Sequence, residues 1–324
     1  MTSLATIWAE ARRNPVMPAV WTLAAGLVAY VFVTGGYLIA VLHFAAIYVV
    51  FVTGLNIFMG YAGQVSFGHN AFAAISGYTS AVLTANHGWE PLPAAGLGLL
   101  GALACALIVG WPTLRLRGHY LAMATLAIGL IVYEVAVQWQ AVTQGYMGIS
   151  GIPPLGIGKF TATSDRAILV LLLAFALVSV LAAAGIRRSR LGRAFVAIAG
   201  SEDAARALGI DVARYKLIAF LISAFYAAVA GSLFVHAVGF VSPEVYGLHM
   251  VVLAFTMLYV GGIGTIAGAA LGALVIALLP ETVRRFSEYQ DLAYGGLLIL
   301  ILIYAPGGLA SLSRLWSARR KEGA

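Results

Sequence analysis

Long, uninterrupted runs of apolar residues are the feature that most limits what this chain can fold into. Runs of about 20 such residues recur, for example at 38–59, 92–111 and 120–139. A run of roughly this length crosses the hydrocarbon core of a bilayer as an α-helix. Because 62% of the 324 residues are hydrophobic and only 10% are charged, the composition excludes a single soluble domain and a disordered chain. The runs are continuous rather than alternating, which disfavours a β-barrel porin.

The pattern predicts an all-α polytopic integral membrane protein with about eight to ten transmembrane helices, forming a single transmembrane domain over residues 1–324. The first run, 16–34, is expected to remain as a span rather than act as a signal peptide, since no clean small-x-small cleavage site follows it. Besides it and the three runs named above, the predicted spans are 71–85, 166–186, 217–236, 248–260, 266–280 and 292–304.

The positive charges predict the orientation. With the N-terminus inside, 15 Lys and Arg residues fall in inner gaps, including the polar segment 187–216, and 4 fall in outer gaps. An excess of this kind marks the cytoplasmic side. We therefore expect a multi-pass protein of the bacterial inner membrane with both termini cytoplasmic and with 140–165 as an external loop. The net charge of +7 forms no basic stripe with interleaved aromatic residues, so nucleic acid is not an expected partner.

A Gly-rich polar break at 60–70 separates two apolar runs. A broken backbone at membrane depth must be satisfied by protein or by a water-filled path, and such breaks form binding sites in transporters. The alternative is a plain cytoplasmic turn with Gly-mediated helix packing. A weak echo, Gly262-x-Gly264-Thr265-x-x-Gly268, follows a later span. The candidate substrate path comprises Gly63, Gln64, Ser66, Gly68, His69, Asn70 and Thr265.

The segment 187–216 contains a predicted short helix, Glu202–Leu208. Ser201 is a good N-cap, acidic residues occupy the first turn, and Gly209 suits the position after the helix end. The helix is expected to expose Ala204, Ala205 and Leu208 to a partner on the cytoplasmic side, although an ordinary interhelical loop is the alternative. The candidate coupling residues are Glu202, Ala204, Ala205, Arg206, Leu208 and Gly209.

Other polar residues give weaker signals. Glu134 is an acid inside an apolar run, and such acids are costly in a membrane, but it lies near the outer end and could reach the interface. His43 is isolated, and the histidines near 236–249 have no metal-ligand spacing, so no metal site is expected. The sequence contains no G-x-x-x-x-G-K-[ST], G-x-S-x-G or H-E-x-x-H motif, so neither an ATPase nor an enzyme is indicated.

Three stretches together resemble a known family. They are 54–69 with Ala71-Phe72, then Gly192-Arg-Ala with Glu202-x-Ala-Ala-x-x-Leu-Gly-Ile210 and Lys216-x-x-x-Phe220, and then Gly261–Gly268. The combination is similar to the permease subunits of branched-chain amino acid ABC importers, most closely the LivM type. The resemblance covers about residues 38–308. Ala199 and Gly200 depart from the pattern, because relatives often have Arg followed by an acidic or polar residue there.

The resemblance implies a second permease subunit in a heterodimer, two cytoplasmic ATPase subunits and a periplasmic substrate-binding protein. It implies that 192–210 docks the ATPase, that ATP is used by the partners, and that this chain binds no cofactor itself. The expected function is inward movement of branched-chain or other small amino acids. The alternatives are a urea or short-chain amide permease of the same class, and a stand-alone secondary transporter or channel.

Overall fold

The computed structural model describes residues 26, 28–29, 31–33, 35–157, 160–282, 292, 295–296, 299–300, 303 and 308. Within this part of the chain, six helices are long and apolar enough to cross a membrane. They are α3 with its π-helical extension η1 (Tyr37–Asn56 and Ile57–Tyr61), α5 (Pro91–Thr113), α6 (His119–Gln138), α8 (Asp165–Arg188), α11 (Val212–Val238) and η3 with α12 (Pro243–Tyr246 and Leu248–Gly261).

Two shorter helices complete the described bundle, α4 (His69–Ala85) and α13 (Ile266–Thr282). An all-α polytopic membrane protein is therefore confirmed. The predicted first span, 16–34, and last span, 292–304, fall largely outside the described residues, so the count of eight to ten stays a prediction.

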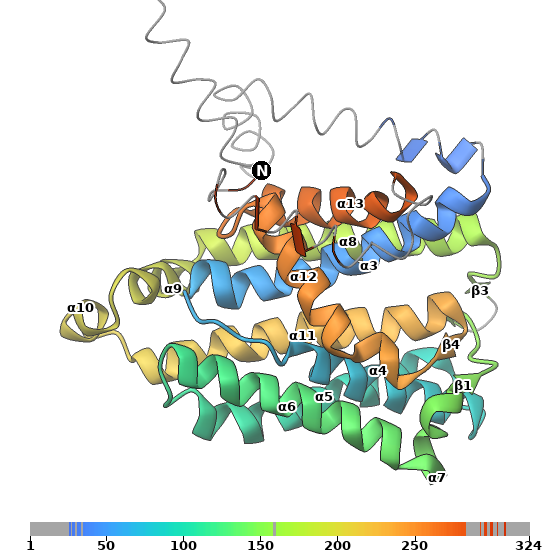
Figure 1. Ribbon diagram of the computed structural model, residues 1–324, viewed down its shortest axis with the longest axis horizontal. Helices are drawn as coiled ribbons and strands as arrows, with labels where there is room; N and C mark the ends of the chain where they lie inside the picture. Colours follow the sequence, from blue (N-terminus) through green and yellow to red (C-terminus); the bar gives the residue numbers. More distant parts are fainter. Residues whose placement is uncertain are drawn as a thin grey trace, which may run out of the picture.

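The core of the bundle is formed by α3 and α11, which contact each other; α11 also packs against α4 and α5, and α3 packs against α8 and α13 (Figure 1). The most apolar windows of the α3–η1 span and of α11 are 61% and 67% buried, whereas those of α5 and α8 are only 22% buried. Since all four helices are apolar, composition does not separate the central helices from the peripheral ones. Small residues do mark close contacts: Gly231 on α11 has no room for a side chain because the Ala73 backbone of α4 lies against it.

The segment 140–165 lies at one end of the bundle. It contains α7 (Gln140–Thr143), η2 (Gly145–Met147) and three short strands, β1 (Ile149–Ser150), β2 (Gly156–Ile157) and β3 (Phe160–Thr161). Strand β1 pairs antiparallel with β4 (Phe240–Val241), which follows α11 (Figure 1). This pairing puts the predicted external loop 140–165 at the same end of the bundle as the connection that follows α11.

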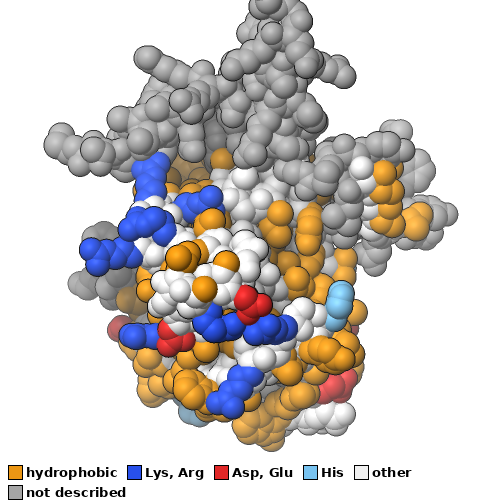
Figure 2. All heavy atoms as spheres, turned by 90° about the vertical axis from the view of Figure 1, so that its left-hand side faces the viewer, with side chains coloured by type: hydrophobic (Ala, Val, Ile, Leu, Met, Phe, Trp, Pro, Cys, Tyr) orange, Lys and Arg blue, Asp and Glu red, His pale blue; other side chains and the backbone are white. Residues whose placement is uncertain are grey.

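The opposite end carries the polar segment 187–216, which is largely helical. It forms α9 (Arg190–Gly200) and α10 (Glu202–Ala207), and α11 begins already at Val212. The predicted start of that span at Leu217 is therefore wrong by five residues, because Asp211 caps the helix by accepting a hydrogen bond from the Arg214 N–H. Figure 2 shows that Lys and Arg side chains gather on this end.

Candidate functional site

The predicted short helix forms with the predicted caps. The Ser201 hydroxyl accepts a hydrogen bond from the Ala204 N–H at 3.2 Å, and Gly209 has a φ of +81°. The N–H of Gly209 donates to the Arg206 carbonyl, and the N–H of Ile210 donates to the Ala205 carbonyl. These two bonds make a Schellman motif, which needs a left-handed residue and favours glycine. The helix ends at Ala207, one residue earlier than predicted.

The expected exposure of Ala205 is wrong. Ala205 is 1% exposed and packs against Ile198 of α9 and Val212 of α11 in a small separate core. That core exists because α10 folds back on its neighbours instead of standing free in solution, which the sequence of α10 alone does not reveal. Leu208, by contrast, is 80% exposed, and Ala204 is also exposed. The exposed apolar surface of this region therefore includes Ala204 and Leu208 but not Ala205.

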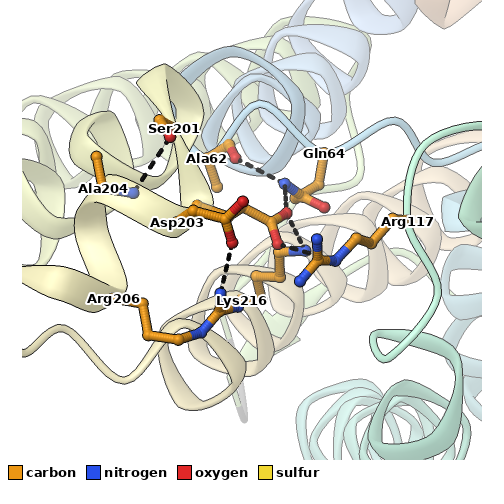
Figure 3. Close-up of polar contacts among 9 residues, drawn as sticks. Ala62, Gln64, Arg117, Ser201, Asp203, Ala204, Arg206 and Lys216 are labelled. Carbon is orange, nitrogen blue, oxygen red and sulfur yellow. Dashed lines mark hydrogen bonds and ion pairs between the residues drawn. The ribbon is translucent and has the colours of Figure 1, made fainter.

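Glu202, the first residue of α10, contacts side chains from three other segments; Figure 3 labels these partners, Gln64, Arg117 and Lys216. Its carboxylate forms an ion pair with Lys216 of α11 and lies 3.6 Å from Arg117, in the turn between α5 and α6. It also accepts a hydrogen bond of 3.3 Å from the Gln64 side-chain amide. The Lys216 side chain is only 3% exposed, so its charge depends on Glu202 for compensation.

Gln64 belongs to an unwound segment, residues 62–68, between η1 and α4 (Figure 1). Gln64, Ser66 and Gly68 are buried, whereas Gly63 and Val65 are exposed, so the burial alternates as in an extended strand. The segment reaches into the bundle instead of forming a turn at its end. His69, which starts α4, contacts Phe220, which lies eight residues into α11, or about 12 Å along that helix.

Two glycines let this segment pack closely. Gly63 has a φ of +67°, and a Cβ there would lie 3.0 Å from the Ala199 side chain of α9. A Cβ on Gly68 would collide with the backbone carbonyl oxygen of Thr125 on α6. The Thr125 hydroxyl also accepts a hydrogen bond from the Phe67 N–H. Ala199, the position that departs from the family pattern, is thus in contact with the candidate path segment.

Ser66, His69 and Asn70 direct their polar groups into the protein. The Ser66 hydroxyl and the His69 Nδ1 are 2.9 Å apart, and the His69 ring is surrounded by Phe58, Phe72 and Phe220. The Asn70 amide donates to the Tyr246 carbonyl at 2.8 Å. In this conformation, the hydrogen bonds of these side chains tie the start of α4 to its neighbours.

The second Gly-rich break, after α12, lies beside the first. Asn56 joins them: its side-chain amide donates to the Thr265 carbonyl at 2.9 Å, and its oxygen accepts a hydrogen bond from the Gly264 N–H at 2.8 Å. The Thr265 hydroxyl donates to the Gly262 carbonyl. The second break therefore lies against the end of α3 and against Gly60, the first residue of the first break, since a Cβ on Gly60 would lie 2.5 Å from the Gly264 nitrogen.

The structure thus joins the two predicted groups of residues through Gln64 and Glu202, while Arg206 forms an exposed ion pair with Asp203 of the same helix. Sequence reasoning missed three contributors. Asn56 is a polar residue inside an apolar run and Lys216 is a charged residue next to one, so both positions were unusual enough to be noticed in the sequence. Nothing in the sequence distinguishes Arg117 from the other arginines between apolar runs.

Comparison with known proteins agrees with this architecture. Residues 37–305 match the family described as "Branched-chain amino acid transport system / permease component". The chain is 37% identical to the high-affinity branched-chain amino acid transport system permease protein LivM of Escherichia coli K12, over 83% of this chain and 68% of that protein. LivH of the same organism is 28% identical over 81% of this chain and 90% of its own length. No solved structure matches the chain.

A more distant relative has a different name. The autoinducer 2 import system permease protein LsrC of Klebsiella pneumoniae is 29% identical over 63% of this chain and 59% of its own length. The family match covers most of the described helices and both Gly-rich breaks. The chain therefore belongs to the family of branched-chain amino acid transport system permease components, and it is a multi-pass membrane protein.

Proposed function

We propose that the chain is one permease subunit of an ATP-driven importer that moves branched-chain or other small amino acids into the cytoplasm. It would pair with a second permease, and two cytoplasmic ATPase subunits and a periplasmic binding protein would complete the assembly. The relatives named LivM and LivH support two different permeases, since both occur in one organism. ATP would be bound and used by the ATPase subunits, not by this chain, which has no P-loop motif.

One observation carries the proposal: the Glu202 contacts connect the short helix α10 to the unwound segment 62–68 (Figure 3). Movement of α10 by a partner would pull on Gln64 through the shared carboxylate, and on α11 through Lys216. A partner that binds α10 differently in its ATP-bound and ATP-free states would shift the balance between inward-open and outward-open conformations. Segment 62–68 would then line the path, with Gly63 and Val65 as its outward edge.

The ATPase would dock on the surface around Leu208, because it is the most exposed apolar side chain of that helix region and lies on the basic end of the protein (Figure 2). This end would face the cytoplasm. A cysteine placed at Arg188, in a Cys105-free background, should resist an impermeant thiol reagent added from the periplasmic side. Labelling from that side would overturn the orientation.

Uptake by the reconstituted assembly tests the function. Proteoliposomes that contain both permeases and the ATPases should transport leucine, isoleucine or valine only when ATP is supplied on the side that carries the ATPases. Transport should also require the binding protein on the opposite side. Uptake of urea or acetamide in place of these amino acids would favour the amide permease. Uptake by this chain alone, driven by an ion gradient, would favour a secondary transporter and contradict the proposal.

A further inference from the structure

The unwound segment 62–68 has a row of backbone groups without protein partners. Within the part of the chain that the structure describes, the carbonyl groups of residues 63–67 accept no hydrogen bond, and the N–H groups of Val65 and Ser66 donate none. Lipid tails offer no hydrogen bonds, so irregular backbone at membrane depth is buried in protein or lines a water-filled space. The depth of the segment therefore decides whether lipid can cover its exposed edge.

A hydrogen bond to α6 places the segment at membrane depth. The Phe67 N–H donates to the Thr125 hydroxyl, and Thr125 lies about 7.5 Å along α6 from Tyr120. Tyr120 is 74% exposed at the start of this helix, and exposed tyrosines favour the membrane–water interface. The far end of the segment is thus inside the span, where its unpaired backbone excludes lipid as the covering.

The exposed edge of the segment begins in a hydrated region. Gln64, on the opposite edge, binds Glu202, which also pairs with Arg117, and the Arg117 side chain is 62% exposed. Gly63 and Val65, on the edge itself, are exposed, and Val65 retains 37% of its accessible surface. Exposed charges hold water around them, so water has access to the edge from this end.

The exposed edge ends at a pair of stacked aromatic rings. Residues 63, 65 and 67 share one face of an extended segment, but Phe67 is covered by Phe255 of α12. Their ring centroids are 4.4 Å apart with 16° between the ring planes, and Phe255 is only 9% exposed. Rings at this separation leave no space for water or for a zwitterionic amino acid between them. An apolar constriction of this kind blocks polar solutes because it does not stay hydrated.

Polar groups flank the aromatic pair on both sides along the chain. Gln64 precedes Phe67 by three residues, and Asn70 follows it by three. The Asn70 side chain is buried, and its oxygen has no hydrogen-bond partner in the described part of the chain. Because the carbonyl groups between Gln64 and Phe67 are not tied to described residues, a shift of Gln64 with the Glu202 carboxylate would be passed along the backbone to the Phe67 ring.

We infer that Phe67 and Phe255 form the gate that closes the proposed path in this conformation, and that the edge of the unwound segment between the basic end and this pair is in contact with water. The inference rests on the proposed function and adds the two side chains that open and close the path. Both residues are gating residues, which act by excluding water and solute rather than by binding the substrate.

Thiol accessibility tests the hydrated edge in membrane vesicles that contain the complete transporter, with Cys105→Ala as the background. Val65→Cys places a reporter on the edge, and Val178→Cys on α8 is the matched control, because residue 178 is more exposed (64% against 37%) but lies on an apolar helix face. A charged, impermeant methanethiosulfonate reagent added at the basic end should modify Val65→Cys at least tenfold faster than Val178→Cys. Equal rates, or no reaction of Val65→Cys, would overturn the hydrated edge.

The same reporter tests the gate when the reagent is added at the opposite side, without ATP. Val65→Cys should be protected while both rings are present, and Phe67→Ala with Phe255→Ala should raise its modification rate at least tenfold. Phe44→Ala with Phe234→Ala is the matched control, since it removes an aromatic contact of 5.7 Å between α3 and α11 and should leave the protection intact. An unchanged rate in the first pair, or the same increase in both pairs, would overturn the gate.

Two further measurements keep folding and substrate apart from gating. Phe67→Ala alone is a smaller change and should raise the rate in the same direction, and labelling from the basic end should stay unchanged in every variant that is still folded. The labelling involves no amino acid, so the expected labelling in a transporter that moves only urea would retain the gate and refute the proposed substrate. Leucine uptake by the wild type, with protection that the alanine pair does not alter, would refute the gate alone.

Discussion

The side-chain amide of Gln64 donates a hydrogen bond to the Glu202 carboxylate at 3.3 Å, although 138 residues separate them along the chain. One residue belongs to the unwound segment inside the bundle, and the other begins the short helix at the basic end. Because Lys216 forms an ion pair with the same carboxylate, a movement of α10 reaches both the unwound segment and the central helix α11. The contact gives a physical route from the proposed ATPase surface to the proposed path.

Glu202→Gln is expected to disrupt this route. It leaves the buried Lys216 without a counter-charge, and removal of one partner of a buried ion pair costs about 3–5 kcal/mol. We expect a lower melting temperature in detergent and at least a tenfold loss of ATP-driven uptake. Asp203→Asn is the matched control: its pair with Arg206 is exposed, and exposed pairs contribute at most about 1 kcal/mol. Equal uptake by the two variants would argue against a role for the Glu202 cluster.

Leu208→Glu is expected to separate docking from folding. Leu208 is 80% exposed, so the protein should fold and insert normally, but a charge in the contact should abolish ATPase co-purification and uptake together. Leu116→Glu, in the neighbouring turn between α5 and α6, is the comparison. If Leu116→Glu alone released the ATPase, docking would be assigned to that turn.

Ala205→Glu tests the small core rather than the docking surface. Ala205 is buried against Ile198 and Val212, so a carboxylate there costs several kcal/mol and should unfold α10. We expect reduced yield and increased proteolysis within 190–211. Ala204→Glu, exposed on the same helix, should leave both measurements unchanged; similar proteolysis of the two variants would contradict the packing of α10.

Gly68→Ala is expected to displace the start of α4, because the added Cβ would collide with the Thr125 carbonyl oxygen. We expect uptake to fall at least tenfold. Gly96→Ala on α5 is the control, since nothing lies within 4 Å of its Cβ position and alanine favours a helix by about 0.5–1 kcal/mol. Normal uptake by Gly68→Ala would show that the unwound segment tolerates movement there.

Asn56→Leu is expected to separate the two Gly-rich breaks. It removes the hydrogen bonds to the part-buried backbone groups of Thr265 and Gly264; a fully buried group left unpaired costs about 1–3 kcal/mol, and these two should cost less each. Thermal unfolding in detergent should therefore shift to lower temperature. Thr53→Val, one turn earlier on α3, is the control: the buried Thr53 hydroxyl has no hydrogen-bond partner in the part of the chain that the structure describes, so its loss should be neutral. Equal melting temperatures for Asn56→Leu and the wild type would refute the bridge.

Much of the local structure was readable from sequence. Apolar length predicts most of the spans, because a helix is the form in which a single segment satisfies its own backbone in lipid. The caps of α10 were also readable, since Ser201 and Gly209 act on groups within a few residues of themselves. The start of α11 differs from the hydropathy-based prediction because Asp211 caps the helix five residues before the apolar run begins.

The sequence by itself determined that this chain crosses a membrane repeatedly, where it breaks its helices, and the short helix at the basic end, because these depend on composition and on neighbours in the chain. Only the tertiary structure decided which side chains meet. It buried Ala205 and set Gln64 and Lys216 against Glu202. Apolar helices have similar sequences on all faces, so hydropathy leaves their neighbours undetermined; close contacts between glycines and backbone, and a few polar bridges such as Asn56, fix the packing.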